Sequence, residues 1–151
     1  MPFVLDACVT LAWCFEDEGS GYADAVLGSL EADTALVPPV WPLEVANGLS
    51  VAERRGRLGS ADVSRFVELL PALPITVEEA SLARALGPIL DLARSEGLSS
   101  YDASYLELAM REGLPLATLD TKIKAAAARL KVAVFQWPPR KRPKRGSDRA
   151  V

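Results

Sequence analysis

The chain has 151 residues and a net charge of −3, half of its residues are hydrophobic, and it contains no histidine. This length suits one domain with an apolar core. The missing histidine excludes a Ser-His-Asp triad, histidine acid–base catalysis and the common zinc sites. The two cysteines have no CxxC or zinc-type spacing, and we expect both to be reduced. With no membrane-spanning run and no secretory signal, a cytoplasmic protein is expected.

The charge is distributed unevenly between the body of the chain and its end. Residues 138–151 contain six Lys or Arg and one Asp, which gives +5, whereas the preceding residues sum to −8. The terminal segment is rich in proline and basic residues and cannot build a core. We therefore expect one folded domain over residues 1–137 and a basic, disordered tail over residues 138–151.

Short apolar runs that end at polar or turn residues predict five strands. In chain order these runs lie at residues 3–5, 35–37, 74–77, 115–118 and 132–135. Helical patterns separate them, at residues 9–15, 22–32, 42–57, 60–70, 78–95, 99–111 and 121–130. Gly87-Pro88 should kink or divide the helical stretch 78–95. This alternation predicts an α/β fold of three layers, in which helices flank a five-stranded parallel sheet of order 3-2-1-4-5.

Four acidic residues stand at the junctions of these elements. Asp6 follows the first strand and Asp120 the fourth, while Glu44 and Asp102 lie in the first turns of two helices. Each has an ordinary explanation. Asp6 and Asp120 suit N-caps, Asp102 could complete a capping box with Ser99, and Glu44 favours the positive end of its helix.

Taken together, the four acids indicate a shared site. The first and fourth strands are neighbours in the predicted sheet, and ligands bind beyond the carboxyl ends of such strands. Four carboxylates in one crevice repel one another, and burial increases the cost. A divalent cation would resolve this conflict, because Mg²⁺ prefers oxygen ligands in octahedral geometry.

Three polar residues could support the acids. Asn47 lies one helical turn beyond Glu44 and could orient it or contact a metal-bound water; a partly buried amide bonded to the backbone explains it equally well. Thr10 and Thr118 could supply hydroxyls near Asp6 and Asp120, or could bond to local backbone.

Four segments, in order over nearly all of residues 2–135, carry a family resemblance: VLDACVTLAW, PLEVANGLSVAERRGRL, SSYDASYLELAMREGLPLATLD and AAARLKVAVF. They resemble PIN domains of the VapC toxin type. The resemblance implies a Mg²⁺- or Mn²⁺-dependent endoribonuclease, the toxin of a toxin–antitoxin pair. It implies that the catalytic and metal-binding quartet is Asp6, Glu44, Asp102 and Asp120. It also implies a homodimer or larger assembly with a cognate antitoxin, whose C-terminal segment blocks the acidic site.

The chain departs from this family in two places. Cys8 stands where the family usually has Ser, Thr or Asn. Because a thiol is a poor Mg²⁺ partner, either Thr10 or water takes that role, or the position is not needed. The basic tail is also longer than a typical member needs.

An RNA substrate requires positive charge outside the acidic pocket. Candidates in the body are Arg54 and Arg55, at the end of the Glu44 helix, and Lys122 after Asp120; solvated helix-end cations explain them equally well. The tail is the stronger candidate for sequence-independent phosphate contact, unless it is only a solubilising extension. Its leading basic residues are Arg140, Lys141 and Arg142.

Two other classes of function compete with the ribonuclease. A receiver-like signalling domain also binds Mg²⁺ through acids, but it needs an acid pair after the first strand and an Asp after the third. Here Asp6 has no adjacent acid, and Val77 leads to Glu78. The second alternative is a catalytically inactive PIN-fold module that only binds, against which the presence of all four acids argues.

Overall fold

The computed structural model describes residues 1–15 and 21–139. Over these residues it contains a four-stranded parallel sheet of order β3-β2-β1-β4. The strands are β1 (Phe3–Leu5), β2 (Ala35–Val37), β3 (Ile75–Val77) and β4 (Leu116–Ala117). β1 is central and completely buried, as expected for an apolar strand covered on both faces. The predicted α/β class and the order of the first four strands are confirmed.

The predicted fifth strand is present only as a remnant. Within the described residues, its segment pairs with the sheet through a single parallel bridge between Leu116 and Val134. β4 itself is two residues long, so it offers little backbone for a fifth strand. Phe135 then packs inward and stacks on Phe3, with ring centroids 4.0 Å apart. The five-stranded prediction was therefore wrong in its strand count.

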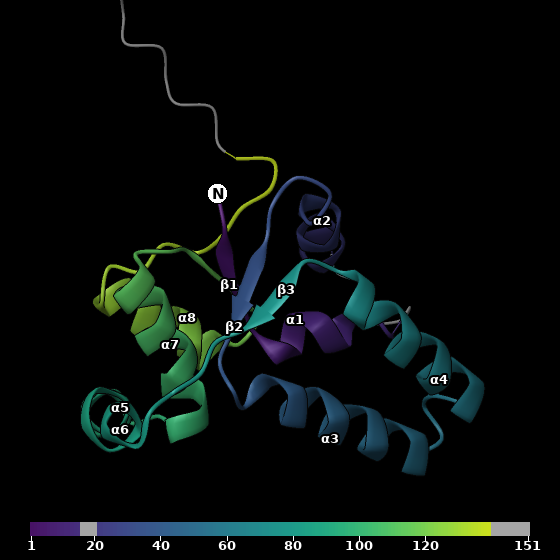
Figure 1. Cartoon of the computed structure of the whole chain (residues 1–151), viewed down its shortest axis with the longest axis horizontal. Helices are drawn as coiled ribbons and strands as arrows, with labels where there is room; N and C mark the ends of the chain where they lie inside the picture. Colours follow the sequence, from purple (N-terminus) through teal and green to yellow (C-terminus); the bar gives the residue numbers. More distant parts are fainter. Residues whose placement is uncertain (16–20, 140–151) are drawn as a thin grey trace, which may run out of the picture.

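Helices flank the sheet in three layers. α7 (Ser100–Glu112) and α8 (Thr121–Arg129) lie on one side, and α1 (Ala7–Ala12) and α2 (Gly21–Ser29) on the other (Figure 1). α3 (Trp41–Arg54) and α4 (Ser60–Leu69), the latter followed by a 3₁₀ turn at Leu70–Ala72, extend away from the sheet. α7 buries every residue from 103 to 109 and is the main helix of the core.

The helical stretch predicted over residues 78–95 begins later and is divided in the middle. Ser81 is its N-cap and accepts a hydrogen bond from Arg84 N–H. A π-helical segment, Ala85–Ile89, joins α5 (Leu82–Arg84) to α6 (Leu90–Glu96). Pro88 lies inside this segment and has no N–H to donate, so the wider π turn accommodates it. The predicted interruption at Gly87-Pro88 is confirmed.

No helix in the described part of the chain is long and apolar enough to cross a membrane. The predicted tail lies outside the described residues from residue 140 onward, and so do Arg140, Lys141 and Arg142.

Candidate active site

All four predicted acids line one open pocket of about 270 Å³. Asp6 leaves β1 and Asp120 follows β4, so both stand at the carboxyl ends of neighbouring strands. This is the position at which open α/β sheets bind their ligands. The other lining residues are Ala7, Cys8, Leu11, Asn47 and Gly48.

Asp6 is the most enclosed of the acids, with 4% of its surface exposed. One carboxylate oxygen, Oδ1, accepts a hydrogen bond from Cys8 N–H at 3.3 Å, and Oδ2 accepts one from the Thr118 hydroxyl at 2.7 Å. The Thr118 hydroxyl also accepts from Asp120 N–H at 3.1 Å. Burial raises the pKa of Asp6, and the charge of Asp120 raises it further. Thr118 thus links the two acids near which the sequence placed it.

The capping explanations hold together with the shared pocket. Asp6 is the N-cap of α1, and Asp120 is the N-cap of α8, where it accepts from Ile123 N–H at 2.9 Å. Each cap uses one carboxylate oxygen, so capping and pocket lining do not exclude each other. For α7 the cap is Ser99, which accepts from Asp102 N–H at 3.1 Å.

The carboxyl groups of Asp102 and Glu44 both have raised pKa values. Burial is the main cause for each. The charges of Asp6 and Asp120 add to the rise at Asp102, whereas Lys122 lowers its pKa. At Glu44 the added charges are those of Asp6 and Asp102. Asp6, Glu44 and Asp102 are therefore each affected by the charge of at least one other acid of the pocket, as a shared pocket requires.

Tyr105 contacts one of the four acids, and the sequence analysis did not assign it to the site. Its side chain is completely buried, and its hydroxyl donates a hydrogen bond to Glu44 Oε1 at 2.8 Å. In the sequence, a tyrosine next to Leu106 and Leu108 is indistinguishable from a core residue of the helix. The available signal was its spacing: Tyr105 lies three residues after Asp102, on the same helix face.

Gly48 brings α3 close to α1. A Cβ atom at this position would lie 2.4 Å from Leu11 Cδ1, closer than any real contact. Gly48 lies one helical turn after Glu44, and both Gly48 and Leu11 line the pocket. Asn47 also lines it, on the face where the sequence placed it. The absence of a side chain at Gly48 therefore lets Leu11 pack directly against α3 beside the acids.

Thr10 does not supply a hydroxyl to the pocket. Its side chain is fully buried and accepts a hydrogen bond from Trp41 Nε1 at 3.2 Å. Cys8 does line the pocket, and its sulfur accepts from Leu119 N–H at 3.4 Å. Burial raises the pKa of the Cys8 thiol to about 12, so it stays protonated at neutral pH. The hydroxyl of Thr10 therefore does not replace the Ser, Thr or Asn that the family usually has at position 8. The alternatives that a water takes this role, or that the position is not needed, are left.

The chemistry of the donors suits a hydrated divalent cation. In the described ranges, no three His, Cys, Asp or Glu side chains are arranged to hold a metal ion among themselves. The lining instead offers carboxylate oxygens from four elements and the amide of Asn47. Mg²⁺ commonly binds proteins through one or two carboxylates and keeps several of its waters. The residues therefore fit Mg²⁺ or Mn²⁺ with part of its hydration shell.

The predicted basic residues are placed differently relative to this pocket. Lys122 is near enough to lower the pKa of Asp102. Arg54 instead lines a separate hollow between α3 and α4, and Arg55 is exposed just beyond α3. Of these three, Lys122 alone is placed beside the acids.

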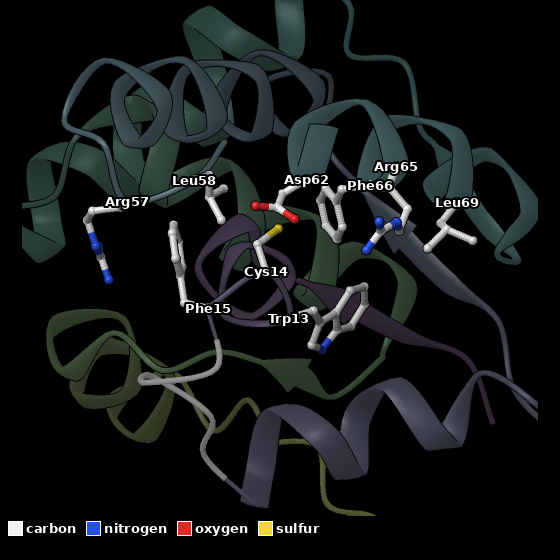
Figure 2. Close-up of a pocket in the computed structure, with 9 residues that line it drawn as sticks. All are labelled: Trp13, Cys14, Phe15, Arg57, Leu58, Asp62, Arg65, Phe66 and Leu69. Atoms are coloured by element: carbon white, nitrogen blue, oxygen red, sulfur yellow. The ribbon is translucent and has the colours of Figure 1, made fainter. Parts of the chain in front are cut away.

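A larger hollow, of about 540 Å³, lies between the end of α1 and α4. Figure 2 shows Trp13, Cys14 and Phe15 there, facing side chains of α4 that include Phe66. The Arg57 guanidinium lies over the Phe15 ring, 4.2 Å from its centroid. Asp62 is the one acid in this lining, so the hollow lacks the carboxylate cluster of the smaller pocket.

Comparison with known proteins identifies the fold family. The family model described as "PIN domain" matches residues 3–129. The chain belongs to the PIN-domain family. Ribonuclease VapC3 of Pyrobaculum aerophilum is 31% identical over 123 residues, which cover 82% of this chain and 92% of the relative. This similarity places the chain among PIN domains of the VapC type.

Solved structures agree on the fold. PAE2754 from Pyrobaculum aerophilum has a TM-score of 0.63 at 27% identity, over 83% of this chain and 79% of that chain. VapBC2 from Rickettsia felis, bound to a promoter DNA fragment, has a TM-score of 0.61 at 14% identity. The match covers 89% of this chain and 98% of that chain. FitAcB from Neisseria gonorrhoeae has a TM-score of 0.57 at 22% identity, over 90% of this chain and 97% of that chain.

The receiver-like alternative is wrong. A receiver has the sheet order 2-1-3-4-5, whereas the order here is β3-β2-β1-β4.

Proposed function

We propose that this PIN domain is a metal-dependent endoribonuclease that hydrolyses RNA phosphodiester bonds. The observation that carries the proposal is the convergence of Asp6, Glu44, Asp102 and Asp120 on one pocket. The pKa values of the first three are raised by burial and by neighbouring acids, so the fold holds like charges together at a cost. Such a cost is commonest where the charges have a function. The similarity to Ribonuclease VapC3 supports RNA as the substrate.

Mg²⁺ or Mn²⁺, when bound, would lower the pKa of a bound water and stabilise charge on the scissile phosphate. One or two of the four carboxylates would hold the cation directly and the others would contact its waters, with Asn47 placed to contact a further one. Thr118 fixes the carboxylate of Asp6 through the 2.7 Å hydrogen bond. Asp6 and Asp120 are also immobilised by capping their helices. These side chains are therefore oriented before any ligand arrives, which lowers the entropic cost of binding.

The proposal includes protein partners. We infer that the chain is the toxin of a toxin–antitoxin pair, inhibited by a cognate antitoxin, and that it forms a homodimer or a larger assembly. The likeness of its fold to the VapBC2 structure supports the antitoxin. Leu82 and Leu86 of the α5 region are 75% and 63% exposed. These neighbouring leucines supply apolar surface suited to a protein contact.

The proposal is tested by metal-dependent cleavage of RNA. The purified chain, incubated with total cellular RNA and Mn²⁺, should produce discrete fragments. EDTA should stop the reaction, and excess Mn²⁺ should restore it. Cleavage that persists in EDTA would reject the metal-dependent mechanism. A folded chain that binds Mn²⁺ but cleaves no RNA would favour the inactive binding module.

Deleting residues 138–151 should weaken RNA binding and flatten its salt dependence. The deletion removes a net charge of +5, and the slope of log K against log salt falls by about one for each phosphate that is no longer neutralised. Binding is measured between about 50 and 200 mM salt in an Asp6→Asn background, which prevents cleavage. A full-length control with the six tail Lys and Arg changed to Gln should match the deletion. An unchanged slope in both would show that the tail does not bind RNA.

A further inference from the structure

We propose that Tyr105 is a positioning residue for the reaction, whose hydroxyl fixes the carboxylate of Glu44 in the acidic pocket. The inference rests on the proposed metal-dependent function, and it adds a residue to that site. Tyr105 does not line the pocket, so it would act through Glu44 and not on RNA or metal.

The hydroxyl of Tyr105 connects three elements. It donates to Glu44 Oε1 of α3 at 2.8 Å and accepts from Ala7 N–H of α1 at 3.4 Å. Its own ring belongs to α7 and is completely buried. One atom therefore sets the position of the Glu44 carboxylate relative to the first turn of α1.

That first turn also carries Asp6. The free N–H groups at a helix start need acceptors, and Asp6 accepts from Cys8 N–H. Tyr105 accepts from the N–H of Ala7, which lies between Asp6 and Cys8 in the sequence. The carboxylates of Asp6 and Glu44 are thus both held relative to the same backbone turn. Asp6 is held by a direct hydrogen bond and Glu44 through Tyr105.

Glu44 needs such a constraint more than the other acids do. It has three side-chain torsions, and it does not cap a helix as Asp6 and Asp120 do. The negative charges of Asp6 and Asp102 act on it and favour its rotation toward solvent. A neutral donor held by the core opposes this rotation. Glu44 is thereby kept in the pocket when no cation is bound.

Tyr22 offers a structural comparison within the same chain. Its hydroxyl also makes a 2.8 Å hydrogen bond, but the acceptor is the backbone carbonyl of Phe135. Tyr22 is half-buried, and a tyrosine hydroxyl that is withdrawn from water needs a partner, for which a carbonyl is sufficient. Tyr105 instead uses a flexible carboxylate that belongs to the pocket. Tyr22→Phe is therefore a control for the loss of a tyrosine hydroxyl that bonds to a backbone carbonyl and not to a carboxylate of the pocket.

The test compares Tyr105→Phe, Tyr22→Phe and the unchanged chain. Mn²⁺ affinity is measured by titration calorimetry, and kcat and KM are measured for RNA cleavage. Loss of a residue that orients a metal ligand typically costs about 10–100-fold in affinity or activity. Tyr105→Phe should lower Mn²⁺ affinity or kcat within this range and leave KM for RNA nearly unchanged. Tyr22→Phe should alter neither, although it also removes a 2.8 Å hydrogen bond of a tyrosine hydroxyl.

A double-mutant cycle shows whether Tyr105 acts through Glu44. In a Glu44→Ala background, Tyr105→Phe should have no further effect on Mn²⁺ affinity. Equal effects of Tyr105→Phe in both backgrounds, or a Tyr105→Phe variant that matches Tyr22→Phe, would overturn the inference. If the unchanged chain binds Mn²⁺ but cleaves no RNA, the proposed function fails while the Mn²⁺ cycle still decides the role of Tyr105. An unchanged chain that does not bind Mn²⁺ overturns both.

Discussion

Asp6→Asn should abolish RNA cleavage while the protein remains folded. Loss of a residue that only orients a ligand already costs about 10–100-fold, so loss of a central ligand should exceed this range. Asn has the same shape and keeps an oxygen for the Cys8 N–H or the Thr118 hydroxyl. It also removes a charge whose burial raises the pKa of Asp6. Initial rates in Mn²⁺ and the melting temperature are the two measurements.

Asp33→Asn is the control for this prediction. Asp33 precedes β2 at the opposite end of the strands and pairs with the N-terminal amine of Met1. A surface ion pair of this kind contributes little to stability, so Asp33→Asn should cleave RNA normally. An Asp6→Asn variant that is folded and fully active would remove Asp6 from the mechanism.

Asp102→Asn should raise the melting temperature of the metal-free protein and weaken its response to Mn²⁺. Ser99 caps α7, so the substitution does not remove the cap side chain. It removes one of several like charges in the pocket. A cation that binds only the native state stabilises it by about 2.7 kcal/mol at a hundredfold excess over its dissociation constant. For a domain of this size, 1 kcal/mol shifts the melting temperature by about 2–4 °C.

The same variant gives a pH dependence with a definite sign. Burial first, and then the charges of Asp6 and Asp120, raise the pKa of Asp102 above its ordinary value of 3.8. At pH values between the ordinary pKa of Asp102, which applies to the unfolded chain, and its raised pKa in the folded protein, the folded protein binds more protons than the unfolded chain. Metal-free stability therefore falls as pH rises through this interval. The fall should be smaller in Asp102→Asn, which lacks this titration, when melts in EDTA are compared between pH 4 and pH 7.

Asp91→Asn is the matched control for Asp102→Asn. Asp91 lies in the first turn of α6 and is exposed. It does not line the acidic pocket, so its substitution should leave the Mn²⁺ response unchanged. If Asp102→Asn melts lower than the unchanged chain in EDTA and both respond equally to Mn²⁺, Asp102 is not part of a charged cluster.

The positions of the four acids could be predicted because they follow from short-range rules. Asp6 ends an apolar strand, Asp120 precedes a helical pattern, and parallel strands place such residues on one edge. The failures have a different origin. Thr10 was placed near Asp6 from its distance along the chain, but α1 directs its hydroxyl to Trp41. That contact joins residues 31 positions apart, and no local pattern encodes it.

The fifth strand and Tyr105 illustrate the same limit. The apolar run 132–135 suits a strand, but the extent of its pairing depends on the two residues that β4 presents. Tyr105 suits a core position in α7, and its bond to Glu44, 61 residues away in the sequence, depends on where the fold places α3. In both cases the sequence determines the burial of the segment, and the partner is determined by tertiary packing.

The contact between Gly48 and Leu11 has a consequence for how the site tolerates its own charge. Electrostatic repulsion drives Asp6 and Glu44 apart, while packing of Leu11 against the bare backbone of Gly48 holds their two helices together. Apolar packing changes little with pH or with the presence of a cation. The spacing of these two helices is therefore preorganised, and the binding of a cation would need only local side-chain adjustment instead of helix movement.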